Sequence, residues 1–203
     1  CQLIKKGEKI KSVEKYPVIV KPRFGAGSRM VLRISDRNQL EQIERQMPFS
    51  EDFIIEDAVP GVEYGIDGMV VENVFHLVLV RKKLLTHPPY RQCVGYFTLC
   101  YQENDVLIKR IEDYMKQMIR IIGLKNGIIH ADVIDDGKKP FVVEMSARPS
   151  GHRLHNLFTP LVTGVDMIED FLRLGMGELN EIIPRRNSEV YAIRYFDMES
   201  DIV

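Results

Sequence analysis

The sequence IIHADVIDDGKKPFVVEMSARPSGH, residues 128–152, decides the fold of this chain. Apolar and polar residues alternate from Ile128 to Ile134 and again from Phe141 to Ala147, as in β-strands with one buried face. The residues between these runs, Asp-Asp-Gly at 135–137, are typical of a tight turn. The pattern predicts a β-hairpin.

The two strands of this hairpin have an apolar and a polar face, because successive side chains of a strand point to opposite sides. A register that sets Asp132 opposite Glu144 also sets His130 opposite Ser146. The apolar face then carries Ile129, Ala131, Val133, Phe141, Val143, Met145 and Ala147, and the polar face carries His130, Asp132, Glu144, Ser146 and Arg148.

Two carboxylates directly opposite each other on the polar face repel and destabilise a sheet. We therefore expect a cation to compensate Asp132 and Glu144. Mg²⁺ is the candidate, because it prefers carboxylate oxygens and leaves coordination positions open for phosphate. The alternative is an ordinary solvent-exposed sheet face that binds no ligand.

The composition limits the function classes. With 203 residues, 45% hydrophobic and 28% charged, the chain is long enough for one large core or two small ones. A formal net charge of −1 gives no general attraction to nucleic acid or to an anionic membrane, so any phosphate binding must be local. No apolar run approaches the ~20 residues of a membrane helix.

The three cysteines, Cys1, Cys93 and Cys100, form no metal-binding spacing and leave an odd thiol. This favours a reducing compartment, and we expect a cytoplasmic protein. The chain begins with Cys1, and its last strand-like run, 190–196, nearly reaches the terminus. Both ends therefore look cut, and we expect that parts of the working protein lie outside this sequence.

A glycine-rich loop lies near the start of the chain. Residues 16–22 form an apolar strand that ends in Lys21, the loop follows at Gly25 to Ser28, and a second strand begins near Met30. Glycine lets backbone N–H groups approach a ligand, and the nearby cations favour an anion. No Gly-Lys-Ser/Thr follows, so this is not a P-loop. The alternative is a flexible hairpin turn with surface cations.

The rest of the chain mixes strands and helices, which indicates an α+β fold. Ser35 and Asp36 are expected to cap a helix that runs to about Met47. The strand from Phe53 enters acidic residues and bends at residues 60–61, as a hinge between lobes would. We further expect strands at 75–80 and 93–101 joined by a polar loop at 81–91, and helices at 105–123, 153–161 and 164–174.

Together, these motifs resemble the ATP-grasp superfamily over about residues 16–177. The resemblance rests on VIVKP at 18–22 with GAGS at 25–28, IED at 55–57 with EY at 63–64, Asp132, and VEMSAR at 143–148. It implies two α+β lobes, 1–55 and 56–203, with the nucleotide site between them. The substrate-binding domain that precedes them in the family is absent from the sequence.

The resemblance also implies roles for individual residues. Lys21 is similar to the lysine that binds the α- and β-phosphates of ATP, and Arg148 to the arginine that steadies the transferring phosphoryl group. Glu63 is similar to the carboxylate that holds the ribose. The implied phosphate loop is Gly25, Ala26, Gly27 and Ser28, the implied adenine-binding hinge is Glu56, Asp57, Ala58 and Val59, and the implied metal ligands are Asp132, Glu144 and Ser146, where Ser146 replaces the usual asparagine.

The activity that this resemblance implies is ligation. An ATP-dependent enzyme with Mg²⁺ or Mn²⁺ would activate a small carboxylate as an acylphosphate, which an amine then captures. The implied substrates are amino-acid-like, and the implied assembly includes the missing N-terminal domain or a partner chain, and a homodimer. The alternative is a non-catalytic or partner-dependent ATP-binding module, and a purely structural domain is a third interpretation.

Overall fold

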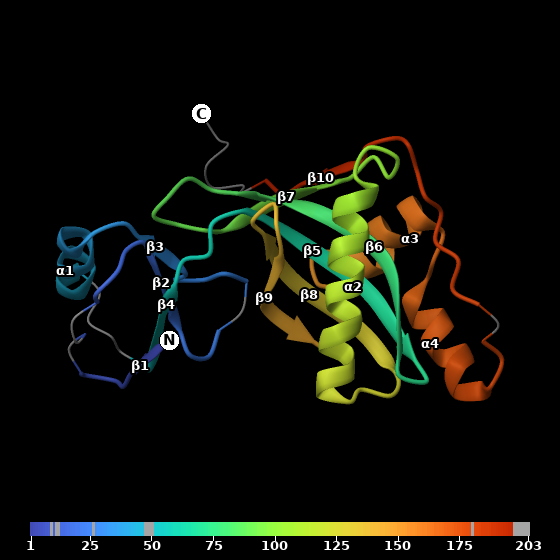
Figure 1. Ribbon diagram of the computed structural model, residues 1–203, viewed down its shortest axis with the longest axis horizontal. Coiled ribbons are helices and arrows are strands. Elements are labelled where there is room, and N and C mark those ends of the chain that lie inside the picture. Colours follow the sequence, from blue (N-terminus) through green and yellow to red (C-terminus); the bar gives the residue numbers. More distant parts are fainter. Residues whose placement is uncertain (9, 11–12, 26, 47–50, 180, 197–203) are drawn as a thin grey trace. The chain divides into compact units, whose positions relative to one another are not determined.

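The computed structural model describes residues 1–8, 10, 13–25, 27–46, 51–179 and 181–196. The chain forms two compact units. Unit 1 comprises Cys1–Val59 and Leu84–Val94, and unit 2 comprises Pro60–Lys83 and Gly95–Val203. The first break between the units thus follows Val59, whereas the expected lobes divide after residue 55. The α+β fold class is confirmed, and each unit has its own sheet (Figure 1).

Unit 1 is built on a four-stranded antiparallel sheet with the order β1-β4-β2-β3. Asp36 caps the helix that follows β3, because its Oδ1 accepts a hydrogen bond from the N–H of Gln39 at 2.9 Å. The expected helix end at Met47 lies outside the described residues. The elements are β1 Gln2–Ile4, β2 Val18–Pro22, β3 Leu32–Ile34, α1 Arg37–Gln46 and β4 Phe53–Asp57.

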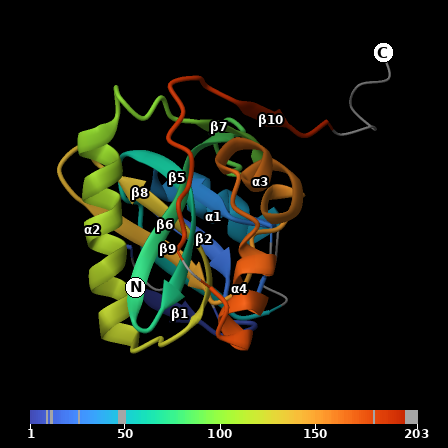
Figure 2. The ribbon, with the colours of Figure 1, turned by 90° about the vertical axis from the view of Figure 1, so that its right-hand side faces the viewer.

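Unit 2 contains a six-stranded sheet with the order β10-β7-β6-β5-β8-β9. Helix α2 covers one face of this sheet, and α3 and α4 lie on the other (Figure 2). The strands are β5 Val62–Val71, β6 Val74–Leu85, β7 Cys93–Thr98, β8 Gly127–Asp135, β9 Pro140–Ser146 and β10 Ala192–Arg194; the helices are α2 Asp105–Ile122, η1 Leu154–Phe158, α3 Thr159–Thr163 and α4 Met167–Met176.

The main core of unit 2 lies between α2 and the sheet. The helix ends at Gly123, whose left-handed conformation (φ 68°) lets its N–H donate a hydrogen bond to the carbonyl of Ile119 in the last turn. The buried side chains of α2 recur every three or four residues, as an amphipathic helix requires. They are Ile108, Ile111, Met115 and Ile119, and they pack with buried side chains of β5, β6 and β8.

Two β-bulges decide which side chains face the core. On β6, Asp67 pairs with Leu79 but Gly68 pairs with Leu77, so Val78 is an extra residue. Alternation reverses at such a residue. Phe75 therefore faces α2, whereas Arg81 and Lys83 point to the opposite side of the sheet.

The length of β6 and the bulge on β9 correct two expectations. Strand β6 continues to Leu85, so the cations at residues 81–83 belong to a strand and not to a loop. On β9, Val143 is the extra residue, because Asp132 pairs with Glu144 and Val133 pairs with Val142. Val142 therefore packs against the core, and Val143, which we expected there, is 39% exposed.

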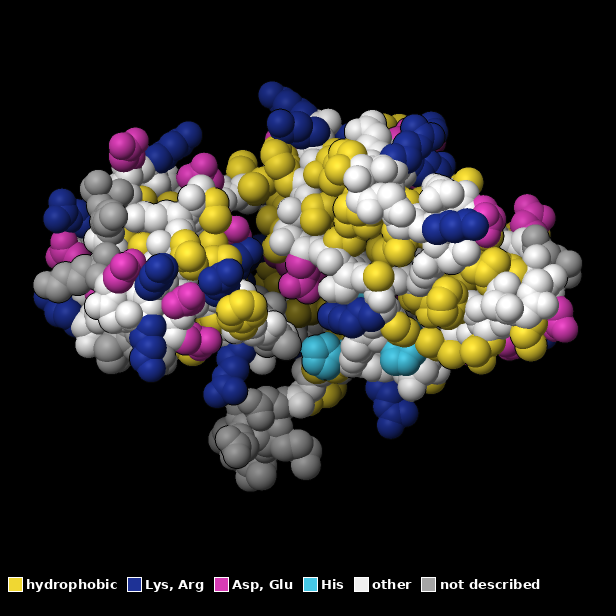
Figure 3. All heavy atoms as spheres, turned by 90° about the horizontal axis from the view of Figure 1, so that it is seen from below, with side chains coloured by type: hydrophobic (Ala, Val, Ile, Leu, Met, Phe, Trp, Pro, Cys, Tyr) yellow, Lys and Arg dark blue, Asp and Glu magenta, His cyan; other side chains and the backbone are white. Residues whose placement is uncertain are grey.

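Helix α4 keeps much of its apolar surface exposed. Met167 is its buried residue, whereas Leu172 and Met176 are more than half exposed. Figure 3 shows apolar side chains gathered at the right-hand end, where α4 lies in Figure 1. Within the described residues, no helix is both long and apolar enough to cross a lipid bilayer.

Candidate functional site

Unit 1 brings two of the predicted nucleotide-binding residues into contact. Strands β2 and β4 are antiparallel, and Ile19 pairs with Glu56, so Glu56 lies diagonally beside Lys21 on the same face. The Nζ of Lys21 donates a hydrogen bond to Oε1 of Glu56 at 2.5 Å. Both side chains keep part of their surface exposed, at 24% for Lys21 and 33% for Glu56. The lysine is therefore held in place and still accessible.

The glycine-rich loop joins β2 to β3. Gly27 has a φ of 66°, and apart from its two chain neighbours no described residue has an atom within 4 Å of the position that a Cβ would take there. Ser28 also has a positive φ, at 58°. Gly25 precedes them, and Ala26 lies outside the described residues. This space leaves the backbone at Gly27 open to a ligand.

The predicted hinge residues continue from β4. Asp57 ends this strand, and the N–H of Ala58 bonds to the carbonyl of Pro17 at 3.1 Å, which ties the segment to the start of β2. Val59 is the last residue of unit 1 before the chain enters unit 2. All of the described residues from Lys21 to Val59 that the resemblance selects therefore belong to unit 1.

Unit 2 carries the other predicted residues on the sheet face opposite α2. The register confirms the predicted hairpin, because Asp132 pairs with Glu144 and His130 pairs with Ser146. On the next strand, Gly65 pairs with Asp132 and Asp67 pairs with His130. We call this side of β5, β6, β8 and β9 the polar face.

Lys83 provides the cation beside Asp132. Its Nζ lies 2.6 Å from Oδ2 of Asp132 and 2.6 Å from Oε1 of Glu63. All three side chains are nearly buried, with 3% of Lys83, 11% of Asp132 and 9% of Glu63 exposed. We expect a metal ion to compensate Asp132 from the hairpin pattern, and nothing in the local sequence points to Lys83. In the structure, a protein ammonium compensates Asp132.

The charge of Lys83 is stabilised by its surroundings. Burial lowers the pKa of Lys83, but the carboxylates of Asp132 and Glu63 outweigh burial and raise this pKa above its ordinary value. Lys83 therefore carries a full positive charge at neutral pH.

The remaining predicted residues of unit 2 lie near the surface. Glu144 and Arg148 are exposed, and Ser146 is half-buried at the end of β9. The Nη1 of Arg148 bonds to the carbonyl of Pro149 at 2.9 Å. Among the residues that the structure describes, no three His, Cys, Asp or Glu side chains are close enough to hold a metal ion as they stand.

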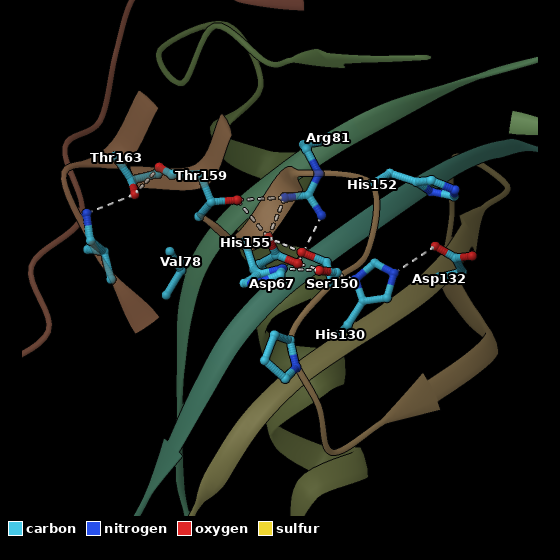
Figure 4. A network of polar contacts seen from close by, with 12 residues as sticks. Asp67, Val78, Arg81, His130, Asp132, Ser150, His152, His155, Thr159 and Thr163 are labelled. Atoms are coloured by element: carbon cyan, nitrogen blue, oxygen red, sulfur yellow. Dashed lines mark hydrogen bonds and ion pairs between the residues drawn. The ribbon is translucent and has the colours of Figure 1, made fainter. Parts of the chain in front are cut away.

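A buried polar network underlies the same face (Figure 4). Its centre is Asp67, which forms an ion pair with Arg81; both side chains are 0% exposed. The Nη2 of Arg81 donates to Oδ1 of Asp67 at 2.9 Å. The hydroxyls of Ser150 and Thr159 donate to Oδ2 at 3.2 and 2.8 Å. We call these residues, with His130, the Asp67 network.

His130 connects the Asp67 network with Asp132. Its Nδ1 lies 3.2 Å from Oδ1 of Asp67, and its Nε2 lies 3.9 Å from Oδ1 of Asp132. Figure 4 shows the imidazole between these two carboxylates. Oδ1 of Asp132 is buried, and no described residue forms a hydrogen bond with it. Asp132 therefore keeps one acceptor available on its buried side.

The ionised state of Asp67 makes the stability of the protein depend on pH. Burial raises the pKa of Asp67, but the charge and hydrogen bonds of Arg81, with the bond to His130, outweigh burial and hold this pKa far below its ordinary value. As the pH falls, the unfolded chain takes up this proton first, near pH ~4. The contribution of Asp67 is therefore complete above that pH and decreases below it.

We expect the free energy of unfolding to decrease more steeply between pH 5 and pH 3 in the wild type than in Asp67→Asn, whose amide takes up no proton. Urea unfolding at a series of pH values, followed by circular dichroism, measures both slopes. Equal slopes would contradict the assignment of acid sensitivity to Asp67.

Comparisons with known proteins agree with this architecture. The model of the ATP-grasp domain matches residues 14–155. The structure is similar to L-amino acid ligase from Bacillus licheniformis, with a TM-score of 0.69 and 20% identity over 89% of this chain and 46% of that chain. No curated protein matches the sequence.

Two further solved structures share the fold. Phosphoribosylglycinamide synthetase from Anaerococcus prevotii has a TM-score of 0.61 and 17% identity, over 89% of this chain and 46% of that one. The biotin carboxylase domain of 2-oxoglutarate carboxylase from Hydrogenobacter thermophilus, in complex with MgADP, has a TM-score of 0.58 and 15% identity, over 83% of this chain and 38% of that one.

This chain thus spans less than half the length of these solved proteins. At such low identities, the likeness establishes the fold, and the family model, which matches most of the sequence, establishes the family. The chain belongs to the ATP-grasp family.

Proposed function

We propose that the protein is the ATP-grasp part of an ATP- and Mg²⁺-dependent ligase that joins a carboxylate to an amine. The observation that carries this proposal is the pairing of Asp132 with Glu144 on the polar face. Two opposed carboxylates on neighbouring strands repel each other, and a cation bound between them removes that repulsion. Membership of the ATP-grasp family supports ATP as the nucleotide that the protein binds.

The residues around Asp132 fit a magnesium ion. Oδ1 of Asp132 is a buried acceptor with no hydrogen-bond partner among the described residues, whereas Oδ2 is paired with the Lys83 ammonium. Oxygen ligands are those that Mg²⁺ prefers, and Mn²⁺ accepts the same set. Asp132 and Glu144 would hold the ion, with Ser146 or a water in a third position. The bound ion would neutralise phosphate charge.

The remaining predicted residues would bind the nucleotide. Lys21, held by Glu56 on the unit 1 sheet, supplies a partly exposed ammonium for the α- and β-phosphates. The loop at residues 25–28 offers backbone N–H groups to the terminal phosphates, and residues 56–59 offer backbone groups to the adenine edge. The exposed Arg148 supplies charge for the transferring phosphoryl group.

The proposed reaction has two steps. A substrate carboxylate oxygen attacks the γ-phosphorus of ATP, so that ADP leaves and an acylphosphate forms. The nitrogen of an amine then attacks the acyl carbon, phosphate leaves, and the nitrogen loses a proton. The protein contributes positioning and charge stabilisation, and no side chain forms a covalent bond.

We propose amino-acid-like substrates, because the structural likeness to an L-amino acid ligase accompanies the Glu144-to-Arg148 motif. A further domain or a partner chain would complete the substrate site, a homodimer is the proposed assembly, and the cytoplasm is the proposed compartment. The second candidate is an ATP-binding module without turnover, which the replacement of the usual asparagine by Ser146 favours.

We expect Lys21→Met to weaken ATP binding by at least about tenfold and to leave adenosine binding nearly unchanged, because one charged hydrogen-bond donor to phosphate contributes about 1.5–3 kcal/mol. Calorimetric titration with and without Mg²⁺ measures both affinities. Lys109→Met, which removes an exposed lysine of α2, is the matched control. Equal losses for ATP and adenosine would contradict the phosphate role of Lys21.

Turnover distinguishes the two candidate functions. A ligase should release phosphate from ATP only when an amino-acid carboxylate and an amine are both supplied, and Glu144→Gln should abolish that release. A folded protein that binds MgATP and releases no phosphate with any amino-acid pair, even as the full natural protein, would support the binding module.

A further inference from the structure

Arg148 lies in a short loop that leaves the polar face and comes back to it. In one row of the sheet, Asp67 of β5 pairs with His130 of β8, and His130 pairs with Ser146 at the end of β9. The chain leaves this row at Ser146 and comes back to it at Ser150, whose hydroxyl donates to Oδ2 of Asp67 at 3.2 Å. Arg148 is midway between the two serines, so short spans of chain tie it to one row of the sheet on both sides.

The second half of this loop has a strained backbone. We call residues 147–153, between β9 and η1, the Arg148 loop. His152 has a φ of 53° and Arg153 has a φ of 62°. Both values lie in the left-handed region, which is unfavourable for a residue with a Cβ. Such a conformation persists only where the surrounding structure holds it. The shape of the loop therefore depends on its contacts with the rest of unit 2.

Ser150 makes the buried contacts that hold the loop. It is 1% exposed, and Figure 4 shows it beside Asp67 in the buried network. The carbonyl of Ser150 accepts a hydrogen bond from Nδ1 of His155, so both its side chain and its backbone are fixed. Nearer the surface, the hydroxyl of Tyr195 donates to the carbonyl of His152 at 2.9 Å. The loop is thus fastened from the interior at Ser150 and from outside at His152.

We propose that Ser150 is a positioning residue, which holds the Arg148 loop against the polar face through Asp67 and so places the Arg148 guanidinium at the transferring phosphoryl group. The bond from Arg148 to the carbonyl of Pro149 lies within the loop and cannot fix it against the sheet. Asp67 is a firm anchor, because it is ion-paired with Arg81 in the interior. The proposal rests on the proposed function, which assigns Arg148 to the phosphoryl group.

Thr159 provides a matched control for Ser150. Its hydroxyl donates to the same oxygen, Oδ2 of Asp67, at 2.8 Å, and Thr159 is 0% exposed. It belongs to α3 and lies outside the Arg148 loop. Thr159→Val therefore removes a hydroxyl from the same carboxylate without releasing the loop, whereas Ser150→Ala removes a hydroxyl and releases it.

Backbone ¹⁵N relaxation of the protein without nucleotide tests the anchor directly. In the wild type we expect an order parameter of about 0.85 for the Arg148 amide, as in rigid backbone, and in Ser150→Ala a value below about 0.6. Thr159→Val should keep the wild-type value. The amides of β8 should stay rigid in all three proteins, which separates release of the loop from a general loss of structure.

Turnover by the full natural protein tests the consequence for Arg148. We expect Ser150→Ala to lower kcat at least about tenfold and to change the KM for ATP by less than about twofold, because a positioned charge acts on the transition state. Arg148→Met should also lower kcat. Adding Ser150→Ala to it should cause no further loss, because both changes act through the same guanidinium. Thr159→Val should keep the wild-type kcat.

Each measurement can overturn the proposal. An Arg148 amide that is mobile in the wild type, or that stays rigid in Ser150→Ala, shows that Ser150 does not hold the loop. A further loss of kcat when Ser150→Ala is added to Arg148→Met shows that Ser150 does not act through Arg148. If Ser150→Ala does not fold, Ser150→Cys, which nearly keeps the side-chain volume and donates only weakly, replaces it in both measurements.

Failure of the proposed function is a separate result. If the natural protein turns over no pair of substrates, the ligase proposal fails, and the relaxation measurement, which contains no ATP, still decides whether Ser150 holds the loop.

Discussion

Arg81→Met is expected to lower the free energy of unfolding by about 3–5 kcal/mol, because it leaves the Asp67 carboxylate buried without its cation. Arg81 and Asp67 are both 0% exposed, and the guanidinium donates through two nitrogens to both carboxylate oxygens. The hydroxyls of Ser150 and Thr159 remain as donors, but they carry no charge. Urea unfolding at pH 7 measures the loss.

Two further variants isolate the cause of this loss. Arg81→Met combined with Asp67→Asn should be more stable than Arg81→Met alone, because the amide removes the uncompensated charge and still accepts from the two hydroxyls. Lys109→Met, which breaks an exposed ion pair with Asp113 on α2, should change stability by no more than about 0.5 kcal/mol. A decrease in the free energy of unfolding of less than about 1 kcal/mol for Arg81→Met would show that the charge of Arg81 contributes little to stability.

Gly61→Ala is the second change with a large expected effect. Gly61 lies just before β5 and has a φ of 138°, a conformation that side chains rarely adopt. A Cβ there would lie 2.3 Å from the carbonyl oxygen of Asp135 and 2.9 Å from Cγ2 of Ile134. The backbone of β8 can relieve this contact only by disturbing its pairing with β5, which costs free energy.

We expect Gly61→Ala to destabilise the protein by about 2–6 kcal/mol, from about 1–3 kcal/mol of backbone strain and about 1–3 kcal/mol of overpacking. Gly123→Ala is the matched control, because Gly123 also has a positive φ, at 68°, but has open space around its Cβ position. It should cost only about 1–2 kcal/mol. Thermal unfolding of both variants compares them, and equal losses would mean that the contact with Asp135 is relieved at no cost.

The sequence predicted the parts of the site that depend on local alternation. The hairpin register that sets Asp132 opposite Glu144 followed from period two and a turn, and the pairing confirms it. The helix from Asp105 and its end at Gly123 followed from helical spacing and a stop residue. The fold class followed from the order of these elements.

The cations of β6 could not be placed in this way. Charged residues are rarely buried unless paired, so the run at residues 81–83 indicated a loop. The ion-pair partners of Arg81 and Lys83 lie on other strands. Arg81 pairs with Asp67 on β5, and Lys83 pairs with Glu63 on β5 and Asp132 on β8. Such pairs depend on tertiary contacts that no local pattern reveals.

The extra residue on β6 has a consequence for how relatives of this chain are aligned. Val78 shifts the pairing by one position, so strand residues before and after it follow opposite frames. A relative whose strand lacks that residue would place the lysine equivalent to Lys83 one position earlier in the sequence. An alignment without a gap would then match Lys83 to a residue on the hydrophobic side of the relative's sheet. The residue equivalent to Lys83 in a relative must therefore be found by aligning the part of β6 that follows Val78 separately from the part that precedes it.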